Sequence, residues 1–310
     1  MRGLGASVLA LLSSSAMALD YQNCGHTWQL PQERPQRILA LNQHAADLLL
    51  ALGAGPALAA VSYIDDDAQA LTSGRYRGVP LLSRRYPATE VVYAQGYDLL
   101  VGGFASAFRD RDGVAPRTTL QANGIASYLL ENACAPAPEN GFAAIEQDLR
   151  SLGHLLQREA RASQLITRQR QDLATAKTIA GHSPPLSVFY LDSEVNGLQS
   201  EGKRGFITQL IDAAGGRNLY AEVELNRVTV DAERLLRADP DVIILADAVW
   251  SPAAGKRAYL RQHPALSHLR AVRDDRLIDL PFSHIVPGEH SARTALTLAR
   301  QLLALKQQRP

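Results

Sequence analysis

The sequence contains few cysteines, few aromatic residues and no excess of either charge. Among 310 residues only Cys24 and Cys134 are cysteines, which excludes a disulfide-dense scaffold and a four-cysteine zinc site within one chain. Lys and Arg number 32 against 31 Asp and Glu, so charge gives no argument for binding nucleic acid or an anionic membrane surface. The hydrophobic content of 46% is typical of globular proteins and argues against disorder.

Long hydrophobic runs are also missing, because no segment reaches the roughly 20 apolar residues that span a bilayer. Residues 1–18 instead carry a secretory pattern. Arg2 precedes a short run of small and apolar residues, and Ala16 and Ala18 are small residues at the −3 and −1 positions of a cleavage site. We predict a signal peptide cleaved after Ala18 and a soluble mature protein exported to the periplasm. The alternative is a buried N-terminal helix.

Export changes the expected state of the two cysteines. In an oxidising compartment Cys24 and Cys134 are predicted to form a disulfide. Such a bond closes a loop of about 110 residues, which the chain-entropy model values at about 4–5 kcal/mol. The alternative is two free thiols.

Apolar strands alternate with helical segments on both sides of a long helical stretch. The expected strands are 38–41, 58–62, 98–103, 125–130, 186–191, 241–246 and 276–280. Continuous apolar strands separated by helices are typical of parallel sheets covered on both faces. Residues 141–180 contain no proline, and their apolar residues recur at helical spacing. We therefore predict an α/β protein in which one long helix, 141–181, joins an N-terminal lobe, 19–140, to a C-terminal lobe, 182–310.

Several segments, each weak alone, occur together in a familiar order. They are 37–42 (RILALN), 47–53 (DLLLALG), 88–101 (ATEVVYAQGYDLLV), 205–216 (GFITQLIDAAGG), 230–245 (VDAERLLRADPDVIIL) and 263–277 (HPALSHLRAVRDDRL). Together they make the chain resemble the periplasmic substrate-binding proteins whose two lobes are bridged by a single rigid helix. That class serves importers of ferric siderophores, cobalamin and haem. One departure is Gly96-Tyr97-Asp98, where the family usually has Lys-Pro-Asp.

The resemblance implies a membrane partner. In the family, a Glu in each lobe docks onto Arg residues of the inner-membrane ABC permease, which works with its ATPase. The matching residues are Glu90 and Glu233. The alternative is that each Glu only complements the dipole of a helix N-terminus. We expect a monomer with no resident cofactor and no nucleic-acid partner.

Ligands of open α/β sheets bind at the carboxyl ends of the strands, which in a two-lobe protein face the cleft between the lobes. The loops expected there are rich in residues that suit a flat, partly apolar ligand with anionic groups. We predict ligand contacts for the aromatic residues Tyr63, Tyr86, Phe104, Phe108, Trp250 and Phe282, for Arg84 and Arg227, and for His44 and His284. The alternatives are packing roles for the aromatic residues and a solvated surface position for Arg84.

The position of Arg84 bears on the choice of ligand. It lies six residues before Glu90, where hydroxamate-siderophore binding proteins have an Arg that contacts the iron-bound oxygens and cobalamin binders have an aromatic residue. A guanidinium can donate paired hydrogen bonds to an anionic chelate. The sequence thus favours capture of a metal chelate, above all a ferric siderophore. Cobalamin, another corrinoid, haem, or a bare Zn²⁺ or Mn²⁺ ion are the alternatives.

An enzyme is the rival class of function. The chain has no Gly-x-Ser-x-Gly, no Walker loop and no GxGxxG placed between a strand and a helix. No plausible pair of nucleophile and base stands out either. We therefore expect no catalytic activity.

Overall fold

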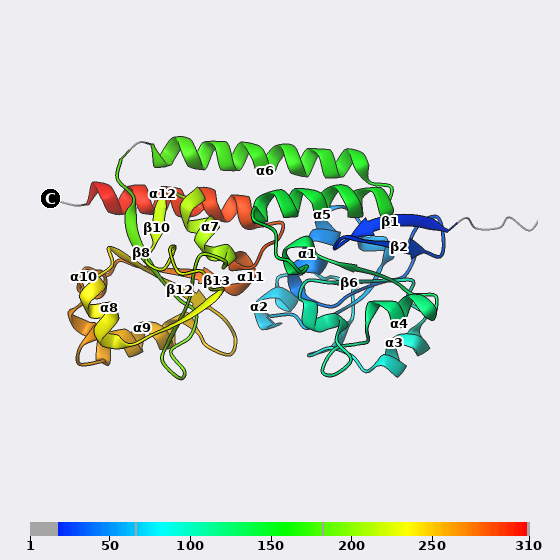
Figure 1. Ribbon diagram of the computed structural model, residues 1–310, viewed down its shortest axis with the longest axis horizontal. Helices are drawn as coiled ribbons and strands as arrows, with labels where there is room; N and C mark the ends of the chain where they lie inside the picture. Colours follow the sequence, from blue (N-terminus) through cyan, green and yellow to red (C-terminus); the bar gives the residue numbers. More distant parts are fainter. Residues whose placement is uncertain (1–17, 66, 182, 309–310) are drawn as a thin grey trace, which may run out of the picture.

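The computed structural model describes residues 18–65, 67–181 and 183–308, which form two α/β lobes lying side by side (Figure 1). The predicted signal peptide therefore lies outside the described residues except for Ala18. Among the described helices, none combines the length and the apolar character that crossing a membrane requires.

The N-terminal lobe is built on a parallel sheet with the strand order β5-β4-β3-β6-β7. Its strands are β3 (Ile38–Ala40), β4 (Leu58–Ser62), β5 (Leu81–Ser83), β6 (Leu99–Gly102) and β7 (Ala126–Leu129), and its helices are α1 (Gln43–Ala51), α2 (Asp67–Thr72), α3 (Thr89–Gln95) and α4 (Arg117–Ala122). Successive strand residues enter different cores, since Leu99 packs in one cluster and Leu100 in another. This alternation confirms a sheet that is covered on both faces.

The C-terminal lobe repeats this design with a parallel sheet in the order β10-β8-β12-β13. Its elements are β8 (Leu186–Leu191), α7 (Phe206–Ala213), β10 (Gly216–Asn218), α8 (Ala232–Ala238), β12 (Val242–Asp247), α9 (Ala253–Gln262), α10 (Arg270–Arg273), β13 (Leu277–Pro281), α11 (Phe282–Ile285) and α12 (Ser291–Gln307). A separate antiparallel pair, β9 (Leu198–Glu201) and β11 (Arg227–Val230), follows the end of β8. The sequence pattern did not predict this pair.

An N-terminal hairpin extends the first lobe and carries the disulfide. Strands β1 (Leu19–Asn23) and β2 (His26–Leu30) pair in antiparallel fashion. The Asn23 side chain binds both the backbone N–H and the carbonyl of Leu129 at 2.9 Å, which docks the hairpin on β7. The predicted disulfide between Cys24 and Cys134 is confirmed, with the Cα atoms 5.2 Å apart.

The segment between the lobes differs in one respect from the expected continuous helix. It contains two helices, α5 (Gly141–Leu155) and α6 (Glu159–Ala180), so the prediction of one unbroken helix over 141–181 is wrong. The chain reverses at 156–158, where Gln157 has a φ of 54°. Gly153 allows the two helices to pack closely, because a Cβ there would lie 2.6 Å from the Cβ of Ala162.

Helix α6 alone spans both lobes, as expected of a connecting helix (Figure 1). Near its start Ile166 packs into the core of the N-terminal lobe, and near its end Ala176 packs into the core of the C-terminal lobe. Helix α12 packs along much of the length of α6. Helix α6 is therefore part of both cores and links the two lobes through packed side chains.

Candidate functional site

A cavity of about 390 Å³ lies between the lobes, where strands of both parallel sheets end. From the N-terminal lobe it is lined by His44, Gly103, Phe104, Ala105, Leu130, Asn132, Ala133, Ala137 and Pro138. From the C-terminal lobe it is lined by Tyr190, Asp192, Glu201, Arg204, Phe206, Gln209, Asn226, Arg227, Phe282, Ile285, Val286 and Pro287. This is the position expected for a ligand of a two-lobe α/β protein.

The N-terminal wall is held together by side chains at the ends of β3 and β6. Asn42 accepts the backbone N–H of Gly103 at 3.0 Å. The imidazole of His44 lies directly over Gly103, where any Cβ would clash with the ring. The ring of Phe104 meets the His44 ring edge-on, with the ring centres 4.7 Å apart. A glycine at position 103 is therefore what allows His44 to lie against the sheet end.

His44 is almost fully buried, with 3% of its surface exposed. Burial lowers the pKa of His44, so the imidazole is neutral near pH 7. Its Nδ1 atom has no hydrogen-bond partner among the described residues. The imidazole therefore keeps a buried, unpaired nitrogen in a residue that lines the cavity, which costs free energy while no partner binds it.

The C-terminal wall carries a network of ionisable side chains. Asp192 accepts a hydrogen bond from the Tyr190 hydroxyl at 2.9 Å and from the Arg227 guanidinium at 3.0 Å. Glu201 lies at the end of β9 beside this group. Burial, together with the nearby charge of Asp192, raises the pKa of Glu201 to about 7.

The structure brings four of the ten predicted ligand residues to the cavity: His44, Phe104, Arg227 and Phe282. Trp250 lies just outside it. Its ring meets that of Phe282 edge-on at 4.8 Å, and the residue is 56% exposed. Trp250 therefore contacts a residue of the cavity lining without lining the cavity itself.

The other five predicted residues lie outside the cavity lining. Tyr63 and Tyr86 pair with each other at 5.1 Å, and the Tyr86 hydroxyl receives a hydrogen bond from Asn42 at 3.3 Å. Phe108 packs against Gly102 in the N-terminal lobe. The rings of His284 and His290 are 4.9 Å apart.

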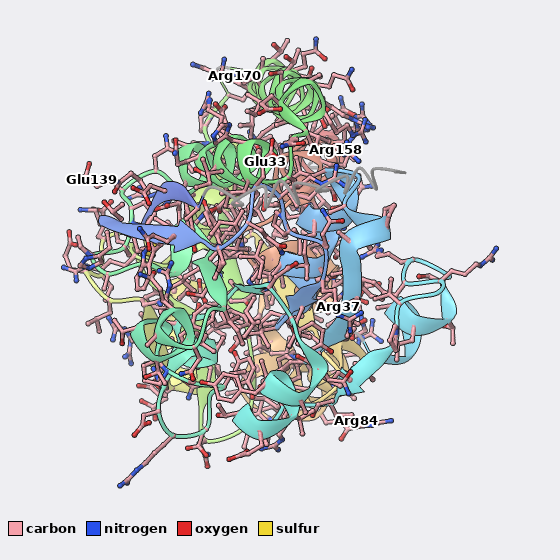
Figure 2. The ribbon with its side chains drawn as sticks, turned by 90° about the vertical axis from the view of Figure 1, so that its right-hand side faces the viewer. Glu33, Arg37, Arg84, Glu139, Arg158 and Arg170 are labelled. Carbon is pink, nitrogen blue, oxygen red and sulfur yellow. A yellow bond between two sulfur atoms is a disulfide. The ribbon has the colours of Figure 1, made fainter. Side chains whose placement is uncertain are left out.

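Arg84 is exposed. Figure 2 shows it at the edge of the molecule opposite Arg170 of α6, with its side chain pointing outward.

The sequence analysis assigned no ligand contact to several residues of the C-terminal wall, notably Tyr190, Asp192, Glu201 and Arg204, although the loop that begins at Asp192 was expected at the cleft. Tyr190 and Asp192 come at and just after the end of a predicted apolar strand, and that position was a usable signal. Glu201 and Arg204 reach the cavity only because β9 folds back beside β8, which no local pattern indicated.

A second charged cluster joins the lobes outside the cavity lining. The Asp47 carboxylate of α1 accepts hydrogen bonds from Arg75 at 2.9 Å and from the Tyr76 hydroxyl at 2.6 Å. From the other lobe, Nε2 of His290 lies 3.6 Å from the Asp47 carboxylate, an ion-pair distance rather than a hydrogen bond. Nδ1 of His290 lies 2.8 Å from the Glu289 carboxylate.

Electrostatics fixes the charge of this cluster. Burial alone lowers the pKa of His290, but the carboxylates of Asp47 and Glu289 outweigh it and raise the pKa to about 9. The imidazolium is therefore charged at neutral pH. Burial and the Asp47 charge together raise the pKa of Tyr76, which stays protonated.

The two candidate docking residues occupy equivalent places. Glu90 is the second residue of α3 and Glu233 the second residue of α8, and both are exposed. Figure 1 shows the two helices in different lobes, both on the side away from α6. Both Glu residues also lie in a first helical turn, so the dipole explanation still applies to each alone.

Comparison with known proteins places this geometry in a known class. Residues 38–283 match the family model described as periplasmic binding protein. A periplasmic binding protein of Veillonella parvula has a similar structure, with a TM-score of 0.78 and 19% identity over 92% of this chain and 97% of that one. Curated proteins gave no match.

Two further solved structures share the fold. One, from Saccharomonospora viridis, is described as an ABC-type Fe³⁺-hydroxamate transport system, with a TM-score of 0.75 and 24% identity over 91% of this chain and 98% of that one. The other is a periplasmic haem-binding protein of Roseiflexus, with a TM-score of 0.72 and 20% identity over 87% of this chain and 98% of that one. At these identities the likeness shows the fold alone.

Proposed function

This chain belongs to the periplasmic binding protein family, the solute-binding components of ABC importers, and we propose that it captures a metal chelate between its lobes. It then delivers the chelate to the permease in the inner membrane, which an ATPase drives. The proposal includes export by the N-terminal signal peptide and a monomeric state.

The cavity between the lobes is the observation that carries the proposal. Phe104 lines it from one lobe and Phe282 from the other, so both lobes offer an aromatic ring to a partly apolar ligand. Arg204 and Arg227 line it too, with side chains 68% and 65% exposed. Guanidinium groups at an open edge suit anionic oxygens of a chelate.

A ferric siderophore is the chelate we favour, and haem or a corrinoid is the second choice. Structural neighbours described as a Fe³⁺-hydroxamate system and as a haem-binding protein support both. A bare Zn²⁺ or Mn²⁺ ion is less well supported, because the described residues contain no group of three or more His, Cys, Asp or Glu placed to hold a metal ion.

Arg84 and Trp250 contribute to the proposal from outside the cavity. Trp250 continues the aromatic wall beyond Phe282, and a chelate larger than the cavity would reach it. We propose that Arg84 contacts a part of the chelate that extends beyond the cavity lining. Replacement of Arg84 by Ala is then expected to weaken binding several-fold, as replacement of Arg227 by Ala is. Unchanged affinity of the Arg84 variant would remove that residue from the site.

Delivery depends on recognition of both lobes by the permease. Glu90 and Glu233 are exposed, and exposed carboxylates contribute more to orientation and association rate than to affinity. Because α6 belongs to both cores, we expect lobe closure on binding to be small. Free and ligand-bound protein should then give similar small-angle scattering profiles, and a large compaction would contradict a rigid bridge.

Calorimetric titration tests the ligand class directly. Ferric hydroxamate and ferric catecholate complexes, haem, cobalamin and zinc chloride are titrated into the mature protein. We expect saturable binding of a ferric chelate in preference to zinc. Binding of zinc with no binding of any chelate would overturn the proposal.

A further inference from the structure

The charges that line the cavity are all on one side. In the described chain the N-terminal wall contributes no Asp, Glu, Lys or Arg to the cavity, whereas the C-terminal wall contributes Asp192, Glu201, Arg204 and Arg227. We infer that the C-terminal wall binds the anionic groups of the ligand together with one proton, which Glu201 accepts. This inference rests on the proposed function and specifies how the same site is regulated.

Glu201 is held at the wall by its own backbone surroundings. Its carboxylate fits against Gly205, where a Cβ would clash with it. It also accepts the backbone N–H of Ile207, in the first turn of α7. These contacts favour the wall-facing position of the carboxylate, so protonation is the response that we expect when a negative charge approaches.

The charge of Arg227 lowers the pKa of Glu201, but it does not cancel the effect of burial. Among the described residues Glu201 has no ion-pair partner, and the Arg227 guanidinium is bonded to Asp192 at 3.0 Å. Arg204 lies 3.8 Å from Glu224 at the surface. Two carboxylates therefore share one arginine at close range, a situation in which one of them readily takes up a proton.

Glu201 is expected to change its charge near neutral pH, whereas Tyr190, His44 and the two arginines of the cavity lining are not. Burial, with the charge of Asp192, raises the pKa of Glu201 to about 7. Burial also raises the pKa of Tyr190, which stays protonated, and lowers that of His44 across the cavity, which stays neutral. The arginines remain charged throughout.

An anionic ligand at Arg204 and Arg227 places negative charge beside Glu201. Its carboxyl group then favours the protonated form, in which the O–H can donate a hydrogen bond to a ligand oxygen. If the bound state is fully protonated, binding takes up about half a proton at pH 7 and about 0.9 at pH 8. The dissociation constant should then rise above pH 7, approaching tenfold per pH unit.

The test uses the mature protein and three anionic probes, namely ferric citrate, a ferric tris-catecholate and haem. Each titration is run at pH 6, 7 and 8 in buffers of different ionisation enthalpy, so that the calorimeter reports protons exchanged per ligand bound. The expected result is uptake that grows from pH 6 to pH 8. Binding without proton exchange, or with release, would overturn the inference and leave the proposed function intact. Failure of every probe to bind would count against both.

Variants assign the proton to its residue. Glu201→Gln should bind with a pH-independent affinity and no proton uptake. Glu222→Gln is the matched control, because Glu222 is exposed on the same lobe and pairs with Arg217, and neither residue lines the cavity. It should keep the uptake of the parent protein. Uptake that persists in Glu201→Gln would refute the assignment.

A second variant works without changing Glu201. Asp192→Asn removes the neighbouring charge and releases Arg227, and both effects lower the pKa of Glu201. The pH midpoint of proton uptake should move downward relative to the parent protein. A midpoint that does not move would contradict the inference.

Discussion

The charged cluster between the lobes gives a sharp prediction about stability and pH. His290→Gln keeps a polar side chain at the N-terminal end of α12 but cannot carry the positive charge that Asp47 and Glu289 face. We expect the variant to be less stable than the parent protein below about pH 8, because two carboxylates from different lobes lose their shared cation.

The magnitude follows from the shift in pKa. The pKa of His290 is about 9 in the folded protein, against 6.5 for an ordinary histidine. A shift of this size corresponds to about 3 kcal/mol. Because the folded-state pKa is the higher one, this stabilisation is fully present below about pH 6.5 and disappears as the pH rises through 9. The side chain is 26% exposed, so solvent screening removes only part of it.

Urea unfolding of both proteins between pH 6 and pH 10 measures the effect. The free-energy difference between parent and variant should be about 3 kcal/mol at pH 6, about half of that near pH 8, and close to zero at pH 10. His154→Gln is the control, since His154 also faces a carboxylate, that of Glu159 at 3.2 Å, but both side chains are largely exposed. A loss that is independent of pH, or equal in the two variants, would refute the reasoning.

Other parts of the molecule lead to further predictions. Reduction of the Cys24–Cys134 disulfide should lower the free energy of unfolding by up to about 4–5 kcal/mol, measured by urea unfolding with and without reductant, and an unchanged midpoint would count against a stabilising role. Trp28 and Trp250 are the only tryptophans, so in Trp28→Phe the fluorescence of Trp250 alone should respond to a bound chelate. No response, together with unchanged affinity of Trp250→Ala, would remove Trp250 from the site. Reversing the charge of both Glu90 and Glu233 should abolish uptake in cells while leaving chelate affinity intact, and normal uptake would reject the docking role. Glu201→Gln should unfold at higher urea concentration than the parent protein at pH 8 but not at pH 4, because the raised pKa of Glu201 destabilises the folded state only where the carboxyl ionises.

The parallel sheets and the disulfide could be predicted from the sequence because each depends on a strong signal. The buried segments 99–102 and 242–246 of two parallel strands are continuous apolar runs. Two cysteines in an exported protein leave one possible intramolecular pair. The reversal at 156–158 was not predictable, because Gln157 in a left-handed conformation interrupts an apolar pattern that continues on both sides.

The site was less predictable than the fold. Residues at the ends of parallel strands, such as His44 and Phe282, could be placed at the cleft because topology brings those ends together. Arg84 and Phe108 occur in loops of similar composition, yet the first is exposed and the second packs in its own lobe. The position of Glu201 at the cavity is set by the antiparallel pairing of β9 with β11. That pairing joins segments far apart in the sequence, so no local pattern predicts it.

The central claim is that the cavity between the lobes holds a metal chelate, and the ligand's mass tests it most directly. Native mass spectrometry of the protein purified from its own periplasm under iron limitation reads that mass without prior choice of a ligand. The account predicts a one-to-one complex carrying a metal and an organic chelator, which is lost when Arg227 and Phe282 are both replaced by Ala. A complex with a bare metal ion, or with a solute that contains no metal, would contradict it.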